Sequence, residues 1–334
     1  MGSPTAILVH NPTAGLRAPG KKELMGLIEA QGFRVKYRSS KRPDLAAKLE
    51  KQGDLIVAAG GDGTIAKVAK ILLGQPEQNA PLAILPTGTA NNIALSLGIG
   101  GTPAEIVESW STVRTRKLSH GICRAHWGEQ SFIEGVGLGS LARATTPKPA
   151  EKGKAGRIRD GRIAFRDAVK EAKPERLYVT VDGTRIEDEV ILIEILNIRQ
   201  VGPRLRLAPA ADAGDKLLDV AYVAAEHRQA LIDWLDALIA GEIDDETAGP
   251  PPCANIPGKK ITIAWNGMEL RLDDKFPLMP GQATAQEKNK KAKNGAEEET
   301  ARNRDQADLL NIEIAERQLS ILAPRGKKKG NTRI

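Results

Sequence analysis

Strand-like and helix-like segments alternate regularly in the first 100 residues, and three of the strand-like segments end in glycine-containing turns, at residues 11–15, 60–64 and 86–92. Apolar, β-branched runs are followed by helix patterns that close at Gly32, Gly74 and Gly98. This alternation is typical of an α/β architecture, a doubly wound and mostly parallel sheet with helices on both faces. The expected strands cover residues 5–10, 33–38, 54–59 and 82–85, and the expected helices cover 20–31, 43–52, 64–73 and 89–97.

After about residue 117 the chain changes to alternating, β-branched runs separated by turn signals such as Asp182-Gly183 and Asn266-Gly267. This pattern predicts an antiparallel, β-rich second domain with helices near 161–172 and 227–240. The expected strands of this domain cover residues 176–181, 189–197, 217–223 and 259–264.

These changes of pattern predict a first domain over residues 1–117 and a second over 118–314. Residues 281–306 have almost no large apolar side chains and many Lys, Glu, Asn and Gln, which predicts a disordered insertion. Order is expected to resume at 309–314 and 319–322. We expect 315–324 to return to the first domain and 325–334 to form a basic tail.

The turn Gly60-Gly61-Asp62-Gly63-Thr64 leads from an expected strand into an expected helix. Glycines allow a sharp turn that exposes backbone N–H groups, and the helix start adds unpaired donors and a partial positive charge. Polyphosphate is the predicted guest, although the turn is neither a Walker loop nor G-x-G-x-x-G. Asp62 would repel bare phosphate, so we interpret it as organising the magnesium that accompanies ATP. The alternative is an ordinary strand–helix turn capped by Asp62 or Thr64.

Two further small-residue turns follow expected strands, one at Asn11–Gly15 and the other at Pro86–Asn92. In a parallel sheet these turns share one carboxyl edge with Gly60–Thr64, and ligands bind at that edge. The sequence therefore predicts a nucleotide cleft there.

Composition excludes several other classes of protein. No apolar run approaches the ~20 residues of a membrane-spanning helix, and the start shows no signal region. Cys123 and Cys253 lie far apart, which favours a reducing cytoplasm over a disulfide framework. The scattered histidines form no zinc pair, and no nucleophile elbow supports Ser-His-Asp chemistry.

Positive charge is concentrated in two segments. Residues 145–176 carry ten Lys and Arg against five acids, and residues 281–334 carry twelve against eight. With only 3% aromatic residues and no recognition motif, a nucleic-acid partner is not expected. An anionic phospholipid surface fits better, at ~1 kcal/mol per basic residue. The alternative is that the charged side chains of these two segments are simply exposed to solvent and bind no partner.

The ordered motifs Asn11–Gly15, Gly60–Thr64 and Pro86–Asn91 resemble those of the diacylglycerol kinase catalytic-domain family, which includes bacterial lipid, sphingosine and ceramide kinases. The resemblance continues through Gly202–Val220 and Leu319–Pro324, and so covers nearly the whole chain except the insertion. It implies a lipid kinase of phospholipid metabolism, cytoplasmic and peripherally bound to a membrane surface. The lipid acceptor and the assembly state, with a homodimer as one option, are left open.

The resemblance also implies individual roles. ATP contacts are implied for residues of the three turns and for one residue just after the second strand, namely Asn11, Ser40, Gly60, Gly61, Asp62, Gly63, Thr64 and Thr89. A structural Mg²⁺ site is implied around Asp215, with main-chain oxygens of Asp212 and Leu217. For these acids, a turn with exposed carboxylates is the alternative. Asp273, in the position of the family's Asp-Gly-Glu turn, is implied as the catalytic general base. Asp62 is the second residue predicted to be catalytic, because it would organise the magnesium carried by ATP.

Several positions depart from the family pattern. After the Gly60–Thr64 turn, Ala66 and Lys67 stand where the family usually has Asn and Glu. Asn92 replaces a usual Asp, Lys216 replaces a usual Gly, and Lys275 replaces a usual Glu. Two hypotheses therefore stay open, an active lipid kinase and a catalytically weak protein that binds nucleotide and lipid. The survival of Asp62 and Asp273 favours the kinase. An NAD kinase is a more distant third, which the motifs at 86–92 and 202–219 argue against.

Overall fold

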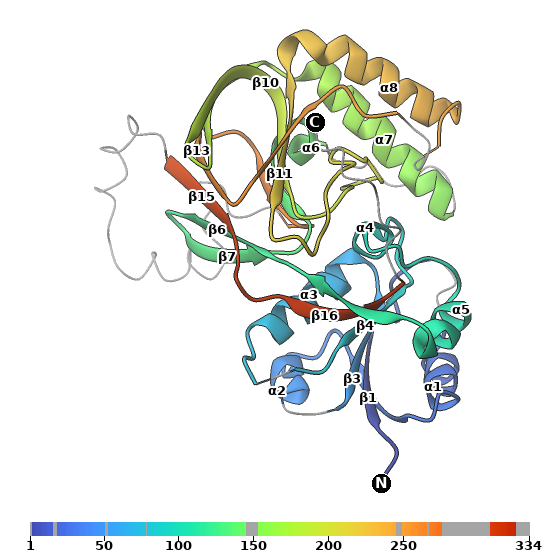
Figure 1. Ribbon diagram of the computed structural model, residues 1–334. Helices are drawn as coiled ribbons and strands as arrows, with labels where there is room; N and C mark the ends of the chain where they lie inside the picture. Colours follow the sequence, from blue (N-terminus) through green and yellow to red (C-terminus); the bar gives the residue numbers. More distant parts are fainter. Residues whose placement is uncertain are drawn as a thin grey trace, which may run out of the picture.

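The computed structural model describes residues 2–15, 19–50, 53–77, 79–144, 153–244, 249–265, 267–275 and 308–324. The expected insertion at 281–306 and the basic tail at 325–334 lie outside these residues, as do residues 145–152 of the basic segment 145–176. Figure 1 shows two domains, with the N-terminal α/β domain below and the β-rich domain above. The predicted fold class is confirmed.

The first domain is built on a sheet with strand order β2-β1-β3-β4-β16-β5. Neighbouring strands are parallel except for β5, which runs antiparallel to β16. Every residue of β1 and β3 is buried, as expected for parallel strands covered on both faces. The strands are β1 (Thr5–His10), β2 (Arg34–Ser39), β3 (Leu55–Gly60), β4 (Leu82–Pro86), β5 (Arg114–Leu118) and β16 (Leu319–Ala323).

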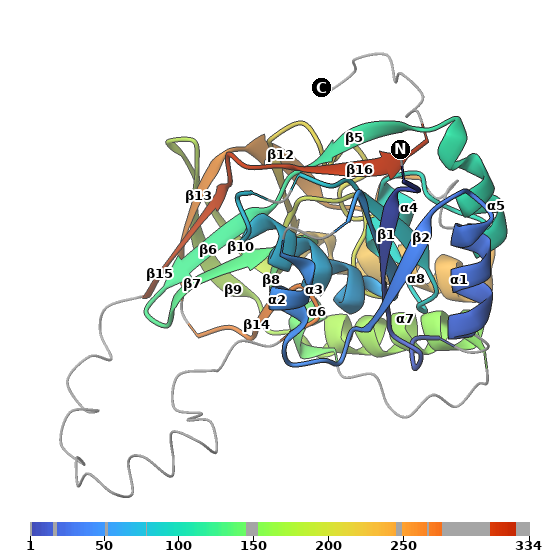
Figure 2. The same cartoon turned by 90° about the horizontal axis from the view of Figure 1, so that it is seen from below.

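Helices cover both faces of this sheet, with α1 and α5 on one side and α2 and α3 on the other (Figure 2). Their bounds are α1 (Lys21–Glu29), α2 (Leu45–Leu49), α3 (Asp62–Leu73), α4 (Asn92–Ser96) and α5 (Pro103–Glu108), followed by a 3-10 turn, η1 (Ser109–Ser111). The helix predicted from residue 64 therefore begins two residues earlier. It includes Asp62 in its first turn.

Strand β16 brings the chain back into the first domain after the whole second domain has been formed. It pairs in parallel with β4, with Leu322 opposite Ala83, and antiparallel with β5. Ile321 is completely buried in the core of the first domain. Residues far apart in the sequence thus complete one sheet.

The second domain is an antiparallel sandwich with strand order β12-β11-β10-β9-β13-β15-β6-β7, joined by β8 on β10 and β14 on β8. Its strands are β6 (Gly121–Ala125), β7 (Gly128–Phe132), β8 (Gly135–Gly139), β9 (Glu175–Val181), β10 (Thr184–Leu196), β11 (Leu218–Ala224), β12 (Ala254–Gly258), β13 (Lys260–Trp265), β14 (Leu270–Leu272) and β15 (Asp308–Ile314).

Two long helices, α7 (Lys154–Glu171) and α8 (Arg228–Ala240), pack side by side on this domain (Figure 1). The domain also contains a short helix, α6 (Ser140–Arg143), and a 3-10 turn, η2 (Ala225–His227). The prediction that α7 starts near 161 was wrong, because the helix begins seven residues earlier, at Lys154. Basic residues that precede the expected helix start, such as Lys154, Arg157 and Arg159, therefore lie on α7. Among the described helices, none has the length and apolar character needed to cross a bilayer.

Candidate nucleotide and phosphoryl-transfer site

The three glycine-containing turns meet at the carboxyl edge of the parallel sheet. A Cβ atom placed on Gly88 would lie 2.3 Å from the Cα of Gly61, and one on Gly15 would lie 2.0 Å from the carbonyl oxygen of Thr87. Gly15 also has a φ of +80°, which favours glycine. The turns therefore touch backbone to backbone, with room for no side chain between them.

A cleft of about 400 Å³ opens above these turns. Six of the eight residues that the sequence predicts as ATP contacts line this cleft: Asn11, Ser40, Gly61, Gly63, Thr64 and Thr89. The remaining lining residues are Ala14, Gly15, Lys67, Gly88 and Asp274. Helix α3 points its N-terminus at the cleft, and no side chain caps that end. Free N–H groups at a helix start suit a phosphate.

Gly60 and Asp62 support the cleft without lining it. A Cβ atom on Gly60 would lie 2.5 Å from the Cβ of Thr64, so glycine is needed there. One carboxylate oxygen of Asp62 accepts a hydrogen bond from the backbone N–H of Ile93 at 3.0 Å. Burial raises the pKa of Asp62, and backbone N–H groups of residues 91–93 oppose that shift. Asp62 thus ties the start of α3 to the start of α4.

Asp273 is buried and its carboxylate already has partners. One oxygen accepts hydrogen bonds from the backbone N–H groups of Ile133, at 2.9 Å, and Glu134, at 2.7 Å. The other lies 2.5 Å from the ammonium of Lys70 on α3. The carboxylate that lines the cleft belongs to the next residue, Asp274, which approaches Gly63. The general-base role of Asp273 remains a prediction, and the geometry adds Asp274 as a second candidate.

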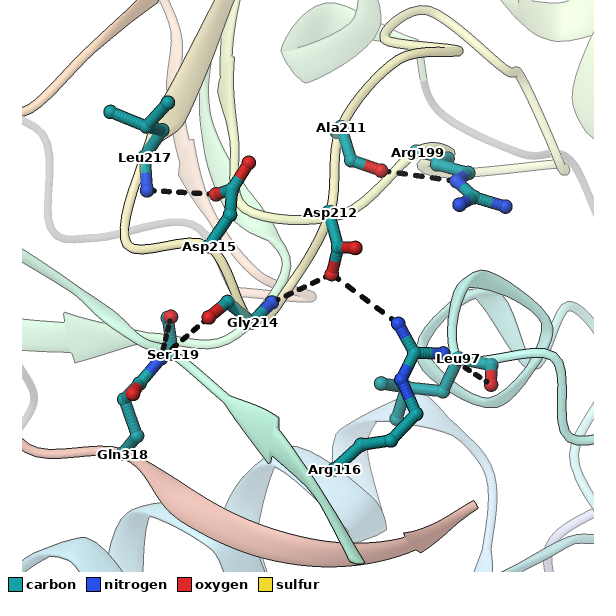
Figure 3. Close-up of polar contacts among 10 residues, drawn as sticks. All are labelled: Leu97, Arg116, Ser119, Arg199, Ala211, Asp212, Gly214, Asp215, Leu217 and Gln318. Carbon is teal, nitrogen blue, oxygen red and sulfur yellow. Dashed lines mark hydrogen bonds and ion pairs between the residues drawn. The ribbon is translucent and has the colours of Figure 1, made fainter. Parts of the chain in front are cut away.

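The predicted magnesium residues Asp212, Asp215 and Leu217 lie in one turn of the second domain (Figure 3). The Asp215 carboxylate accepts a hydrogen bond from the backbone N–H of Leu217 at 2.9 Å. One carboxylate oxygen of Asp212 accepts a hydrogen bond from the backbone N–H of Gly214 at 3.0 Å and lies 3.4 Å from the Arg116 guanidinium. No group of three or more acidic, His or Cys side chains that could hold a metal occurs among the described residues. The site implied by the resemblance uses the Asp215 carboxylate with main-chain oxygens of Asp212 and Leu217, and it stays a prediction.

The same turn also joins the two domains. Gln318, just before β16, donates to the carbonyl oxygen of Gly214 at 2.9 Å and to the hydroxyl of Ser119 at 2.8 Å (Figure 3). Lys216 has a φ of +61° and pairs with Glu316 at 2.8 Å. The left-handed backbone explains why a glycine is usual at this position.

Glu134 is a residue of this site that the sequence analysis missed. It follows β7, is buried, and lies close to Asp62, Asp273, Asp274 and the Arg271 guanidinium. Burial, together with those three negative charges, raises the pKa of Glu134 well above its usual value of 4.5, and Arg271 opposes the shift. A lone acid between apolar strand residues was the available signal, since unpaired carboxylates are seldom buried.

Each domain matches a known protein family. Residues 5–123 match the family described as the diacylglycerol kinase catalytic domain. Residues 138–270 match the family described as the YegS C-terminal NAD kinase beta sandwich-like domain. The resemblance drawn from the motifs is confirmed.

Individual relatives agree with these matches. A diacylglycerol kinase of Bacillus subtilis is 26% identical over 292 residues, which are 83% of this chain and 92% of the relative. A protein of Yersinia enterocolitica named "Probable lipid kinase YegS-like" is 30% identical over 239 residues, covering 70% and 75%. A crystal structure from Bacillus anthracis described as a diacylglycerol kinase has a TM-score of 0.63 at 18% identity, covering 97% of this chain and 98% of that one. At this identity, the structural likeness supports the fold.

We expect Gly88→Ala to lower nucleotide affinity more than tenfold, because the added methyl group would collide with the Cα of Gly61. Such overpacking also costs about 1–3 kcal/mol of folding free energy. Gly100→Ala is the matched control, since a Cβ atom there meets nothing within 4 Å. Calorimetric titration with ATP and chemical denaturation measure the two effects. Equal ATP affinity in both variants would show that the turns are not in tight contact.

We expect Glu134→Gln to stabilise the protein increasingly as pH rises above about 4.5. The raised pKa means that the carboxyl group favours folding below its unfolded pKa of about 4.5, and that this contribution is lost as pH rises toward the folded value. Glutamine carries no such dependence. Relative to wild type, the variant should therefore gain stability between pH 4.5 and pH 8.

Urea denaturation of both proteins at pH 4.5 and pH 8 measures this difference. Glu29→Gln, an exposed change on α1, serves as control, and its free energy of unfolding should equal that of wild type at both pH values. A stability difference between Glu134→Gln and wild type that is the same at both pH values would contradict the buried, charge-crowded position of this carboxyl group.

Proposed function

Because this chain belongs to the diacylglycerol kinase catalytic-domain family and is therefore a phosphotransferase, we propose that it transfers the γ-phosphoryl group of ATP to a hydroxyl group of a lipid. The observation that carries the proposal is the cleft itself. Glycine turns and the uncapped start of α3 form one wall, and a carboxylate of the second domain, Asp274, lines the cleft with them.

The phosphates of ATP are expected to lie on the N–H groups of the first domain. Gly61, Gly63 and Gly88 leave backbone atoms open to the cleft, and Asn11 is held by a 3.2 Å hydrogen bond from its amide to the Thr64 hydroxyl. Oriented N–H groups stabilise charge that is already in position. Magnesium is part of this proposal as the ion that accompanies ATP, and no step of the reaction is assigned to it here.

In the transfer step, the oxygen of the lipid hydroxyl forms a bond to the γ-phosphorus in line with the leaving group. The bond from that phosphorus to the oxygen bridging the β-phosphate breaks, ADP leaves, and the hydroxyl proton passes to a carboxylate. We assign this carboxylate to Asp274, which lines the cleft. Asp273, predicted as the base from the family pattern, would hold the turn and Lys70 in position.

The lipid is expected to approach over the second domain, near α7 and α8. A groove of about 440 Å³ combines apolar walls, such as Ile158 and Leu238, with the cations Lys154, Arg159, Arg162 and Arg204. Burial and the neighbouring Arg204 lower the pKa of Lys154, so like charges are crowded there. Such a surface suits an anionic membrane. Diacylglycerol, a sphingoid or ceramide-type lipid and a related long-chain alcohol are the candidate acceptors.

We expect Asp274→Asn to lower lipid phosphorylation by ~10²–10⁴, because loss of a positioned base has this cost. ATP affinity should not fall, since asparagine keeps the shape of the side chain and removes a negative charge from the cleft. Asp273→Asn should act mainly on stability, because it weakens a buried ion pair with Lys70. The measurement is mass spectrometry of lipids phosphorylated from ATP in a total lipid extract, with nucleotide binding measured on the same preparations.

Two outcomes would revise this assignment. A folded Asp273→Asn variant that loses turnover while Asp274→Asn keeps it would return the base to Asp273. A wild-type protein that binds ATP but phosphorylates no lipid would favour the alternative, a catalytically weak protein that binds nucleotide and lipid.

We expect neutralisation of the basic end of α7 to weaken binding to anionic vesicles. The triple variant Lys154→Gln, Arg157→Gln and Arg159→Gln leaves out Arg162, which is buried and donates to the carbonyl oxygens of Pro203 and Leu238. The attraction should also fall steeply with salt, because charges are screened beyond ~10 Å at 0.1 M. Vesicle co-sedimentation measures both effects, with Lys170→Gln at the other end of α7 as control. Vesicle binding that does not change with salt concentration would indicate that apolar side chains insert into the membrane instead.

A further inference from the structure

Lys67 brings a positive charge into the nucleotide cleft. It lies on α3 three residues after Thr64, so both side chains share the face of the helix that lines the cleft. Its ammonium donates a hydrogen bond to the carbonyl oxygen of Ser40, another residue that lines the cleft, at 2.6 Å. Among the described residues that line the cleft, Lys67 and Asp274 carry the ionisable side chains.

The position of Lys67 suits a phosphate oxygen. An ammonium has three N–H donors, and the bond to Ser40 uses one of them. Charge-assisted bonds from lysine to phosphate are about twice as strong as neutral ones, and lysine binds phosphate as a point charge. Because Lys67 is exposed, its charge is hydrated and costs little to keep there before a ligand arrives.

Two carboxylates beside the cleft are already engaged by groups of the protein. Asp62 accepts a hydrogen bond from the N–H of Ile93, and Asp273 pairs with Lys70. Asp274 is the carboxylate among the residues that line the cleft, and Lys67 is the cationic side chain there.

We propose that Lys67 binds the terminal phosphates of the nucleotide directly and holds the nucleotide in the cleft when no divalent cation is bound. This inference rests on the proposed nucleotide site and not on the lipid acceptor. Lys67 would exchange its bond with Ser40 for the phosphate, so nucleotide binding in this protein depends less on magnesium than the chemistry of ATP alone would require.

The test is calorimetric titration of the full-length protein with ATP and with adenosine, in excess EDTA and in excess magnesium. For wild type we expect ATP affinity in EDTA to stay within ~10-fold of that in magnesium. Lys67→Gln should lose ~10-fold or more of its ATP affinity in EDTA, the equivalent of one charge-assisted bond. Its affinity for adenosine, which has no phosphate, should be unchanged.

Two further variants make the test specific. Lys67→Glu places a carboxylate in the cleft, so we expect ATP binding to vanish in EDTA and to return in part with magnesium. Lys22→Gln makes the same charge change as Lys67→Gln on an exposed face of α1, outside the cleft, and should alter neither affinity.

Each contrary outcome has its own reading. If Lys67→Gln lowers ATP and adenosine affinity equally, Lys67 only fixes the position of Ser40, and the inference is wrong. If Lys67→Gln binds ATP in EDTA as well as wild type does, the phosphate contact does not exist. A wild type that binds no nucleotide in either buffer overturns the inference together with the nucleotide site. Binding without lipid phosphorylation supports the inference and removes only the proposed acceptor.

Discussion

The contact between glycine turns at the carboxyl edge of the first sheet is the constraint on which the rest of the site depends. A Cβ atom on Gly88 would lie 2.3 Å from the Cα of Gly61, which leaves no room for a side chain at position 88, and a Cβ atom on Gly61 would lie 3.2 Å from the Cα of Gly88. This approach aligns the start of α3 with the turn after β4 and leaves backbone N–H groups facing one cleft. Asn91, with a φ of +59°, donates to the carbonyl oxygens of Pro86 and Gly88 and so fixes the second turn.

The second domain is attached to these same turns, which couples the phosphate site to the acceptor side. Asn92 donates to the carbonyl oxygen of Gly202 at 3.0 Å, and Arg204 donates to that of Ala90 at 3.0 Å. From the other direction, Lys70 on α3 reaches Asp273 on the turn after β14. Asp274 therefore lines the cleft because its neighbour is anchored to the helix that begins at the phosphates.

The sequence predicted much of the fold and of the phosphate site because local signals carry them. The strand at 5–10 and the run 82–85 were located within a residue, and six predicted nucleotide contacts share the cleft. Local sequence signals could not predict the direction in which the acidic side chains point. Only the tertiary structure shows that Asp273 faces Lys70 while Asp274 faces the cleft, and that Asp212 turns toward Arg116. Glu134 was missed because its charge neighbours come from α3 and from the turn after β14, distant in the sequence.

The most direct measurement of the central claim is backbone amide hydrogen exchange with and without a non-hydrolysable ATP analogue. If the glycine turns hold the phosphates, saturating analogue should slow exchange of the amides at residues 60–64 and 87–89, while amides of α8 change little. Saturation of the protein with no added protection in either turn would contradict this account, because the nucleotide would then be bound elsewhere.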